Sequence, residues 1–392
     1  MTTLHLTEAT TLPSDGYAGA LCARVWRPDV AGPSIVALRA GGAFDISAQF
    51  ATMRDLCEAP DPAAAARAAP GERLASLAEI LANTPPEARD AARPWLLAPI
   101  DLQAIKAAGV TFAASMIERV IEERARGQSA AAAAIRAEMT RLVGADLSTL
   151  APGSPAAMRL KQALIAEGAW SQYLEVGIGP DAEIFTKSQP MSAVGAGADA
   201  GFHSASAWNN PEPEVVLAIS SKGAIVGATL GNDVNLRDFE GRSALLLGKA
   251  KDQNASCAVG PFLRYFDATF GLDDVRGAEV NLRVEGEDGY LLEGGSSMAR
   301  ISRDPADLAR QLMGASHQYP DGAALFLGTM FAPVADRDAP GKGFTHRPGD
   351  IVAVSADKLG RLTNRMRHCQ DCPPWDFGVG RLMRNLARRG LI

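Results

Sequence analysis

Two apolar runs joined by a short polar turn make up residues 214–233, which read EVVLAISSKGAIVGATLGND. Runs of strand length on either side of a Gly-containing turn are typical of an antiparallel β-hairpin. Few polar side chains interrupt either run, so both strands are predicted to be buried. This segment is therefore expected to fold back on itself inside the protein.

Further hairpins are predicted toward the C-terminus. Residues 278–295, AEVNLRVEGEDGYLLEGG, alternate Val280, Leu282 and Val284 with polar residues before they turn. Such alternation indicates a strand with one buried and one solvated face. Residues 349–366 repeat the pattern. Several antiparallel hairpins close together favour a rolled sheet or a barrel, so the chain is assigned to the α+β class with a β-rich core.

The first part of the chain has a different character. Short strands with Gly and Pro turns are predicted within residues 22–47, and an Ala-rich helical stretch follows at residues 61–94. A group of prolines near the end of that stretch marks a boundary. We predict a small N-terminal α/β domain at residues 1–95 and a larger catalytic domain at residues 96–392.

Two further helices are expected near the start of the larger domain. Within residues 106–127 a turn of small residues precedes a helix, in which Met116, Ile117, Val120 and Ile121 form the apolar face. The charged residues of that helix are expected to face solvent, namely Glu118, Glu122 and Arg124. A second helix is predicted at residues 129–144, where Ile, Met and Leu keep helical spacing within an Ala-rich stretch.

Composition excludes several functions. The chain has 392 residues, of which 47% are hydrophobic, and its formal net charge is −6. No basic stripe indicates a nucleic-acid partner, and no apolar run is long enough to cross a bilayer. The N-terminus lacks the basic start and apolar stretch of a signal peptide, and five cysteines fit reduced thiols, so a cytoplasmic location is expected. Cys369 and Cys372 form a CxxC pair, but no second pair completes a zinc site, so ordinary thiols are expected there.

Acidic residues flank the open end of the first hairpin. Glu212 and Glu214 are two residues apart, so their side chains point the same way from an extended chain. If the turn centres on residues 221–222, Glu212 lies opposite Gly231 and Asp233 follows just beyond. Three close carboxylates need a compensating cation, and ligands that are all oxygen favour Mg²⁺, Mn²⁺ or Ca²⁺. From spacing alone, an exposed strand end with unrelated acids remains the alternative.

Five motifs occur in an order and spacing that resemble one known family. They read PEPEVVL, GNDVNLRDFE, KDQNASCAVGPFL, LGTMFAP and PGDIVAVSADKLGRLTNRM. Together they resemble the fumarylacetoacetate hydrolase family over roughly residues 98–368. Residues 98–127 and 170–187 are similar to the branch of that family that dehydrates 2-keto-3-deoxypentonates. The resemblance implies the rolled-sheet core of that family and a homodimer or a dimer of dimers.

The resemblance also implies roles for individual residues. Metal ligands fall on Glu212, Glu214 and Asp233, with Mg²⁺ as the cofactor and Mn²⁺ as a second choice. A family lysine falls on Lys251, which is expected to act as a base or to bind the substrate carboxylate. The remaining candidates are Thr329, Ser115 and Thr111 for substrate binding and Glu118 as a catalytic acid. Lys187 is a weaker candidate, and Arg237 with Asp238 is expected to form a structural ion pair.

One departure from the family pattern bears on the reaction. Hydrolases of the family have an Asn-Tyr-x-x-His-x-x-Glu segment, but here Thr111, Phe112 and Ser115 replace the first three named residues, while Glu118 is retained. Without the imidazole, no base is evident that would generate hydroxide near neutral pH. The replacement favours a lyase over a hydrolase.

The expected reaction is the metal-dependent dehydration of a 2-keto-3-deoxypentonate in oxidative pentose breakdown, with 2-keto-3-deoxy-D-xylonate as the substrate. A divalent ion would acidify the C3 hydrogens of such a 2-oxo acid. Loss of the C4 hydroxyl and tautomerisation would then give 2,5-dioxopentanoate. Two alternatives stay open, an acylpyruvate-type C–C bond hydrolase and a non-catalytic protein that binds 2-oxo acids.

Overall fold

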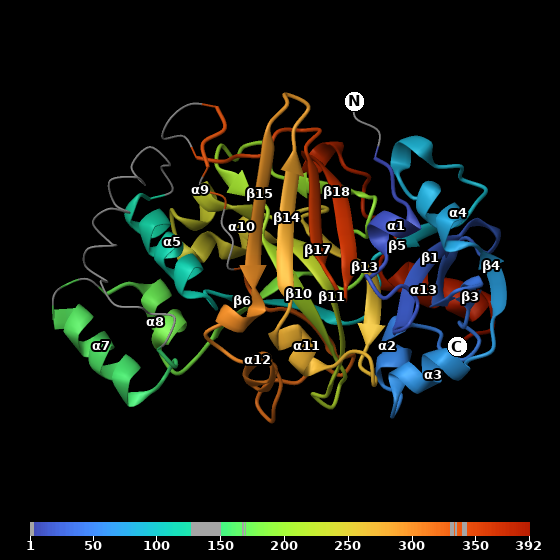
Figure 1. Ribbon diagram of the computed structural model, residues 1–392, viewed down its shortest axis with the longest axis horizontal. Helices are drawn as coiled ribbons and strands as arrows, with labels where there is room; N and C mark the ends of the chain where they lie inside the picture. The colour runs from blue at the N-terminus through green and yellow to red at the C-terminus, as the bar shows by residue number, and fades with distance from the viewer. Residues whose placement is uncertain are drawn as a thin grey trace.

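The structure is a computed structural model that describes residues 4–126, 150–166, 168, 170–329, 333, 335–338 and 343–392. The helix predicted at residues 129–144 lies outside the described residues. Strands outnumber helices in the part of the chain that is described, and the α+β class is confirmed (Figure 1).

The strands, in chain order, are β1 (Ala20–Arg27), β2 (Gly32–Arg39), β3 (Gly42–Asp45), β4 (Glu72–Ala75), β5 (Trp95–Leu97), β6 (Ala104–Gly109), β7 (Glu183–Ser188), β8 (Asp199–Phe202), β9 (Asn209–Asn210), β10 (Pro213–Ile219), β11 (Ile225–Asp233), β12 (Asn235–Leu236), β13 (Cys257–Tyr265), β14 (Glu279–Glu285), β15 (Leu291–Ser297), β16 (Ala323–Phe326), β17 (Ile351–Ala356) and β18 (Gly360–His368). The α-helices are α1 (Glu8–Thr11), α2 (Met53–Cys57), α3 (Pro62–Ala68), α4 (Leu77–Ala82), α5 (Ala113–Arg124), α7 (Pro155–Ala166), α8 (Gln172–Ile178), α9 (Arg237–Glu240), α10 (Leu247–Lys251), α11 (Leu272–Arg276), α12 (Pro305–Leu312) and α13 (Val379–Arg388).

Two open sheets carry the fold. The larger has 11 strands in the order β4-β3-β2-β1-β13-β11-β10-β16-β6-β7, with β5 paired to β1. The smaller has five strands in the order β15-β14-β17-β18-β8. Most pairs are antiparallel, while β16 with β6 and β18 with β8 are parallel. Among the described residues neither sheet closes on itself, so the rolled core takes the form of layered open sheets rather than a barrel.

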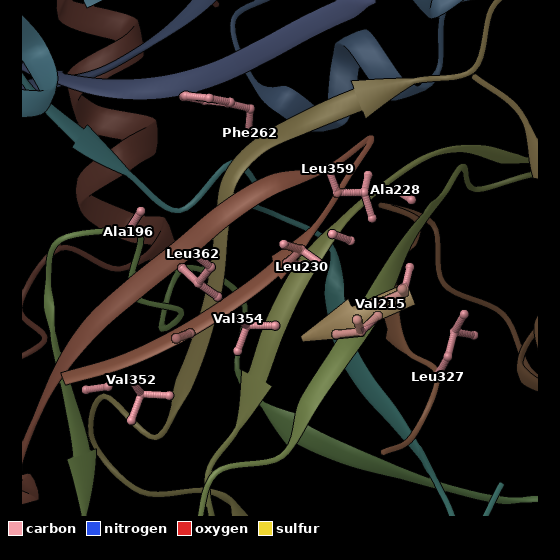
Figure 2. Packing of buried hydrophobic residues seen from close by; sticks show 14 of the residues in the cluster. Ala196, Val215, Ala228, Leu230, Phe262, Leu327, Val352, Val354, Leu359 and Leu362 are labelled. Carbon is pink, nitrogen blue, oxygen red and sulfur yellow. The ribbon is translucent and has the colours of Figure 1, made fainter. Parts of the chain in front are cut away.

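The main hydrophobic core lies between the two sheets (Figure 2). Val215 and Leu230 of the larger sheet face Val354 and Leu362 of the smaller one, and all four are buried. Strand β10 is buried along its whole length, because Val216 packs on its other face against a separate apolar cluster. An uninterrupted apolar run is the pattern that a strand covered on both faces requires.

The hairpin of β10 and β11 forms as predicted, but its register differs from the prediction. Glu214, and not Glu212, lies opposite Gly231, and the Asp233 amide donates to the Glu212 carbonyl. The turn is longer than expected, because the pairing ends at Ile219 and is irregular beside it. The shift brings Asp233 directly opposite Glu212 instead of beyond it, so the three acids converge more closely than predicted.

The N-terminal strands are part of the larger sheet. Strand β1 pairs with β13 from Ala20 to Cys22 and with β5 through its second half. The strands expected at residues 22–47 form as β1, β2 and β3, and the Ala-rich stretch contains α3 and α4 with β4 between them. The division of the chain at residue 95 stays a prediction.

The alternation predicted for residues 278–295 is confirmed. Val280, Leu282 and Val284 of β14 are buried, while Glu279 and Asn281 are exposed. This strand pairs with β15 and β17, and its apolar face contributes to the main core. No helix in the described part of the chain is long and apolar enough to span a membrane.

A buried ion pair stabilises the loop before β17. Arg337 donates to both carboxylate oxygens of Asp350 at 2.6 and 2.8 Å, and the side chains of both residues are 1% exposed. Burial alone would raise the pKa of Asp350, but hydrogen bonds from Arg337 and His346 outweigh it and hold the pKa at about 2. Asp288, which is 29% exposed, also contacts Arg337.

Replacing Asp350 with Asn is expected to cost about 3–5 kcal/mol of the free energy of unfolding, because Arg337 then keeps a buried charge with one partly exposed partner. The pKa of Asp350 is lowered by folding, so its contribution is complete above its unfolded pKa and is lost as the pH falls toward about 2. Urea unfolding should show a full difference at pH 6 that shrinks below about pH 4. Glu293→Gln, which weakens the exposed pair with Arg283, is the control and should cost under about 1 kcal/mol. Equal losses for the two variants would contradict this prediction.

Candidate metal centre

Three carboxylates meet at the end of the central hairpin. Glu212 precedes β10, Glu214 lies at its start, and Asp233 ends β11. Each offers an oxygen atom, and the three oxygens lie within 4.8 Å of one another. All three residues are at most 2% exposed. The hairpin and its two partner strands therefore hold the acids together inside the protein, which rules out the alternative of an exposed strand end.

Two lysines and an arginine surround these acids. Lys251 donates to Glu212 at 2.5 Å and to Asp233 at 3.0 Å. Lys187 lies 2.7 Å from the other oxygen of Asp233 and also donates to backbone carbonyls. Arg119, from α5, contacts the second oxygen of Glu212. Lys187 was only a weak candidate from the sequence, but here it positions one of the predicted metal ligands.

The surrounding cations do not compensate all three acids equally. For Glu212, burial acts to raise the pKa, but the charges of Lys251 and Arg119 outweigh it and lower the pKa to about 2. For Glu214, burial and then the charges of Asp233 and Glu212 raise the pKa well above its ordinary value. Glu214 receives one hydrogen bond, from the Gly328 amide at 2.6 Å. Of the three acids, Glu214 is therefore the one whose ionised form is least compensated by nearby cations.

A hard divalent cation fits this arrangement. Carboxylate oxygens are the ligands that Mg²⁺, Mn²⁺ and Ca²⁺ prefer, and a cation beside Glu214 would offset the repulsion that raises its pKa. Among the described residues, the same three acids form the only group of three or more side chains of metal-ligating type within that distance. Cys369 and Cys372 are not part of such a group, and burial raises their pKa values to about 11 and about 12, so both are neutral thiols near pH 7.

Lys251 occupies the position between two of the acids. Burial would lower its pKa, but the charges of Asp233 and Glu212 outweigh burial and raise it, so the ammonium is charged in this arrangement. The cavity at the acids measures about 20 Å³, which suits an ion or a water molecule and not a sugar acid. A larger ligand therefore needs side chains of the cavity wall to move.

Some of the predicted substrate contacts line this cavity and others do not. Thr329 and Ser115 lie in its wall, beside Gly328 and Arg119. The Ser115 hydroxyl donates to the Phe112 carbonyl at 2.9 Å, within its own helix.

Two of the predicted site residues are placed outside the cavity wall. The Thr111 hydroxyl is fully buried and donates to the Leu327 carbonyl at 2.7 Å. Gly328 has a φ of +90°, and a side chain there would collide with that hydroxyl. Glu118 is 3.3 Å from Arg237 and does not line the cavity. In this arrangement neither residue is placed to contact a ligand at the acids.

The structure also contains charged residues that the sequence interpretation missed. Glu122 was expected in solvent, but it is 1% exposed and pairs with Arg119 and Arg237 at 2.6 Å each. Arg237 and Asp238 do not pair with each other, because Asp238 instead accepts from Ser206 and the Ala207 amide. The expected ion pair is therefore replaced by a network in which α5 and α9 are joined.

Two acidic residues of the cavity wall were not among the candidates, Glu240 of α9 and Glu183 of β7. Glu240 lies 3.1 Å from Arg119. Glu183 could have been found from the alternation of β7, because Phe185 and Lys187 follow it at intervals of two, and both reach the same site. Arg119 and Glu240 carry no such signal, since their proximity depends on the packing of α5 against α9.

Comparison with known families agrees with this geometry. Residues 207–367 match the family described as "Fumarylacetoacetate (FAA) hydrolase C-terminal". That stretch contains Glu212, Glu214, Asp233, Lys251 and Thr329. The match covers less than half of the chain, and over these residues the resemblance found in the sequence is confirmed.

Two curated proteins are similar in sequence to part of this chain. A protein of Saccharolobus solfataricus named 2-dehydro-3-deoxy-D-arabinonate dehydratase is 30% identical over 180 residues, which are 46% of this chain and 57% of the relative. A protein of Haloferax volcanii named "Probable 2-keto-3-deoxyxylonate dehydratase" is 27% identical over 192 residues, 49% of this chain and 62% of the relative. The match thus spans less than two thirds of either relative.

Solved structures support the fold over most of the chain. A 2-keto-3-deoxyarabinonate dehydratase in a hexagonal crystal form aligns with a TM-score of 0.60 at 20% identity, covering 89% of this chain and 99% of that one. A 2-keto-3-deoxy-D-arabinonate dehydratase complexed with magnesium and 2,5-dioxopentanoate aligns with a TM-score of 0.59 at 19% identity and the same coverage. At this identity the likeness establishes the fold.

The metal assignment predicts how Glu214→Gln behaves. Because folding raises the pKa of Glu214, its ionisation costs stability as the pH rises above the unfolded value, and Gln avoids that cost. In EDTA at pH 8 the variant should therefore melt no lower than the wild type. Mg²⁺ at a hundred times its Kd for the wild type should raise the free energy of unfolding of the wild type by about 3 kcal/mol. The same Mg²⁺ concentration should hardly change the free energy of unfolding of the variant.

Glu183→Gln is the matched control, since it makes the same change in the same cavity outside the three acids. Mg²⁺ should still raise the melting temperature of this variant, and calorimetric titration should still detect Mg²⁺ binding. A Glu214→Gln variant that binds Mg²⁺ as tightly as the wild type would contradict the metal assignment.

Proposed function

We propose that the protein is a divalent metal-dependent hydro-lyase that removes water from a 2-keto-3-deoxypentonate and yields 2,5-dioxopentanoate. The observation that carries the proposal is the buried trio of Glu212, Glu214 and Asp233, with Lys251 and Thr329 in the same cavity. The names of the two curated relatives, and the ligands named in the magnesium complex, support the same reaction class.

The names of the two relatives support the same kind of substrate. In a 2-keto-3-deoxypentonate, C2 is a ketone and C3 is a methylene, so C4 is the one stereocentre that remains. D-xylonate and D-arabinonate share their configuration at C4, so their 2-keto-3-deoxy derivatives are one compound. We propose this D-configured acid as the substrate, and the L-arabinonate derivative, its enantiomer, as the compound that the enzyme discriminates against.

We assign roles in this reaction to five residues at the cavity. Glu212, Glu214 and Asp233 would hold Mg²⁺, or Mn²⁺ as a second choice. The cation, when bound, would draw electrons from the 2-oxo group and so acidify the C3 hydrogens. Thr329 would hydrogen-bond the substrate carboxylate. Lys251 is charged in this arrangement, so it would pair with that carboxylate, or it would take the C3 proton after losing its own proton.

The environment of Ser115 favours dehydration over hydrolysis. In hydrolases of the family this position carries the histidine that activates water, whereas the Ser115 hydroxyl here donates to the Phe112 carbonyl of its own helix. A serine that is engaged in this way cannot serve as a general base near neutral pH. We therefore expect no C–C bond cleavage. A role in oxidative pentose breakdown and a homodimer or dimer of dimers stay predictions.

The direct test is turnover of both enantiomers of the substrate. Purified protein with Mg²⁺ should convert 2-keto-3-deoxy-D-xylonate to 2,5-dioxopentanoate, followed by NMR, with a kcat/KM at least about tenfold above that of the L-arabinonate derivative. EDTA should abolish the reaction and Mg²⁺ should restore it. Pyruvate as a product, or hydrolysis of acylpyruvates, would show that the lyase assignment is wrong.

Two threonines provide a matched pair of variants. Thr329→Val removes a hydroxyl from the cavity wall, and the loss of one hydrogen bond to a charged group should raise KM by about tenfold or more. Thr111→Val removes a hydroxyl that contacts the Leu327 carbonyl behind the wall, so it should lower stability by about 1 kcal/mol and leave KM within about twofold. The reverse pattern of steady-state kinetics would exclude Thr329 as the carboxylate contact.

A further inference from the structure

A second cavity lies apart from the metal centre. It measures about 190 Å³, and its lining residues come from four segments that are distant in the sequence, 86–98, 191–199, 254–255 and 373–375. Of the described residues that line it, none also lines the metal cavity. Because an apolar cavity of about 150 Å³ admits benzene, this one can hold a group of about one ring in size.

The walls of this second cavity are mostly apolar and include aromatic rings. Trp95 lies in the wall, and the guanidinium carbon of Arg89 is 4.7 Å from the centre of its ring. Trp375 also lines the cavity and is 47% exposed, which places it at the surface end. The Asn254 side chain holds that segment in place, because its amide nitrogen donates to the Pro373 carbonyl at 3.3 Å. Such walls favour an apolar or aromatic ligand group.

Two groups of opposite charge also line the second cavity, and each has an atom without a hydrogen-bond partner. Asp199 is 6% exposed, and within the described residues its Oδ1 accepts no hydrogen bond. Its Oδ2 lies 3.0 Å from Arg367. Arg89 donates to the Thr84 carbonyl, but its buried Nε has no partner in the part of the chain that is described. Since buried polar atoms usually have partners, both atoms mark hydrogen-bonding capacity that a ligand can use.

Burial leaves both of these charges incompletely compensated. It raises the pKa of Asp199, and the charges of Arg367 and Arg365 offset this only in part. It lowers the pKa of Arg89, although the charges of Asp199 and Glu87 act in the opposite direction. Asp199 and Arg89 therefore lie close enough to interact, and each would gain from a ligand group of opposite charge.

The backbone around the second cavity is strained at two positions. Met191 and Ala255 line the cavity with φ values of 70° and 60°, in the left-handed region that residues other than glycine seldom adopt. The Met191 amide donates to the Asp101 carbonyl and the Gly201 amide to the Ala255 carbonyl, at 2.9 Å each, which holds both in place. Val110, with a φ of 58°, lines the metal cavity. Strain of this kind clusters at ligand sites, and here it occurs at both cavities.

We propose that the second cavity is a binding site for an α-amino acid with an apolar side chain. The ammonium group of the ligand would bind Asp199, its carboxylate would bind Arg89, and its side chain would lie against the apolar wall. A ligand that is only a cation would meet the Arg89 guanidinium, and one that is only an anion would meet the Asp199 carboxylate. A zwitterion compensates both groups and adds no net charge. This inference does not depend on the proposed function.

Four ligands that differ in charge or in the ring test this assignment. L-Phenylalanine should raise the melting temperature of the whole chain and bind it with a Kd below about 1 mM in calorimetric titration. 2-Phenylethylamine lacks the carboxylate, and 3-phenylpropanoate lacks the ammonium group. Each should bind at least about tenfold more weakly, because one charge-assisted hydrogen bond is lost. L-Glutamate keeps both charges but lacks the ring, and it should also bind at least about tenfold more weakly.

Variants at the two charged residues should change this selectivity. Asp199→Asn removes the partner of the ammonium group, so L-phenylalanine and 3-phenylpropanoate should bind it within about threefold of each other. Arg89→Gln removes the partner of the carboxylate, so it should lose the preference for L-phenylalanine over 2-phenylethylamine. Arg93→Gln is the matched control, because Arg93 lies 3.9 Å from Glu79 and does not line the cavity. It should keep both preferences.

Selectivity is a ratio of two affinities within one variant, so a loss of stability alone does not produce the expected change. The ligand series on the wild type tests the assignment even where a variant does not fold. The Kd of L-phenylalanine should also agree within about twofold in EDTA and in Mg²⁺, because the two cavities share no lining residue.

Three results would overturn the proposal. The first is no binding of L-phenylalanine to the wild type at about 10 mM, or equal binding of the four ligands. The second is a Kd that depends on Mg²⁺, which would place the amino acid at the metal centre. The third is a folded Asp199→Asn variant that keeps the wild-type preference for L-phenylalanine over 3-phenylpropanoate.

Discussion

Repulsion among buried carboxylates is the constraint on which the structure of this site depends. Glu212, Glu214 and Asp233 are held within 4.8 Å of one another in the interior, where unpaired charge is expensive. Lys251, Lys187 and Arg119 lie around them because each acid needs a partner. The network extends through Glu122 and Glu240 to Arg237, so α5 and α9 are positioned by charge as well as by apolar packing.

This arrangement explains why the sheet and not a loop carries the site. Strands β10 and β11 are paired on both sides, by β16 and β13, and buried on both faces. Rigid elements can hold like charges at a fixed separation that a mobile segment would relax. A divalent cation would remove most of the repulsion, which ties the occupancy of the site to the stability of the protein.

The sequence predicted much of this site, and its errors have identifiable causes. The hairpin, the alternation of β14 and the three acids follow from periodicity, which depends on near neighbours. The register was wrong by two residues because the irregular pairing near Ile219 has no sequence signal. Glu122 was placed in solvent because of helical periodicity, and Arg119 was not among the candidates. The partners of these two residues include side chains of α9 and of the segment before β10. Such contacts are set by tertiary packing.

The pairing of β1 with β13 limits which segments of the protein could be exchanged with those of a relative. Strand β13 lies beside β11, which ends at Asp233, and the last three residues of β13 pair on the other edge with the N-terminal segment. Without that segment, the end of β13 would present unpaired amide and carbonyl groups, a surface on which other chains can assemble. Residues 207–367 match the family model, but they do not form a unit that could be exchanged between relatives by recombination at the two ends of the match. Chimaeras would have to transfer the first strands together with the metal-binding hairpin.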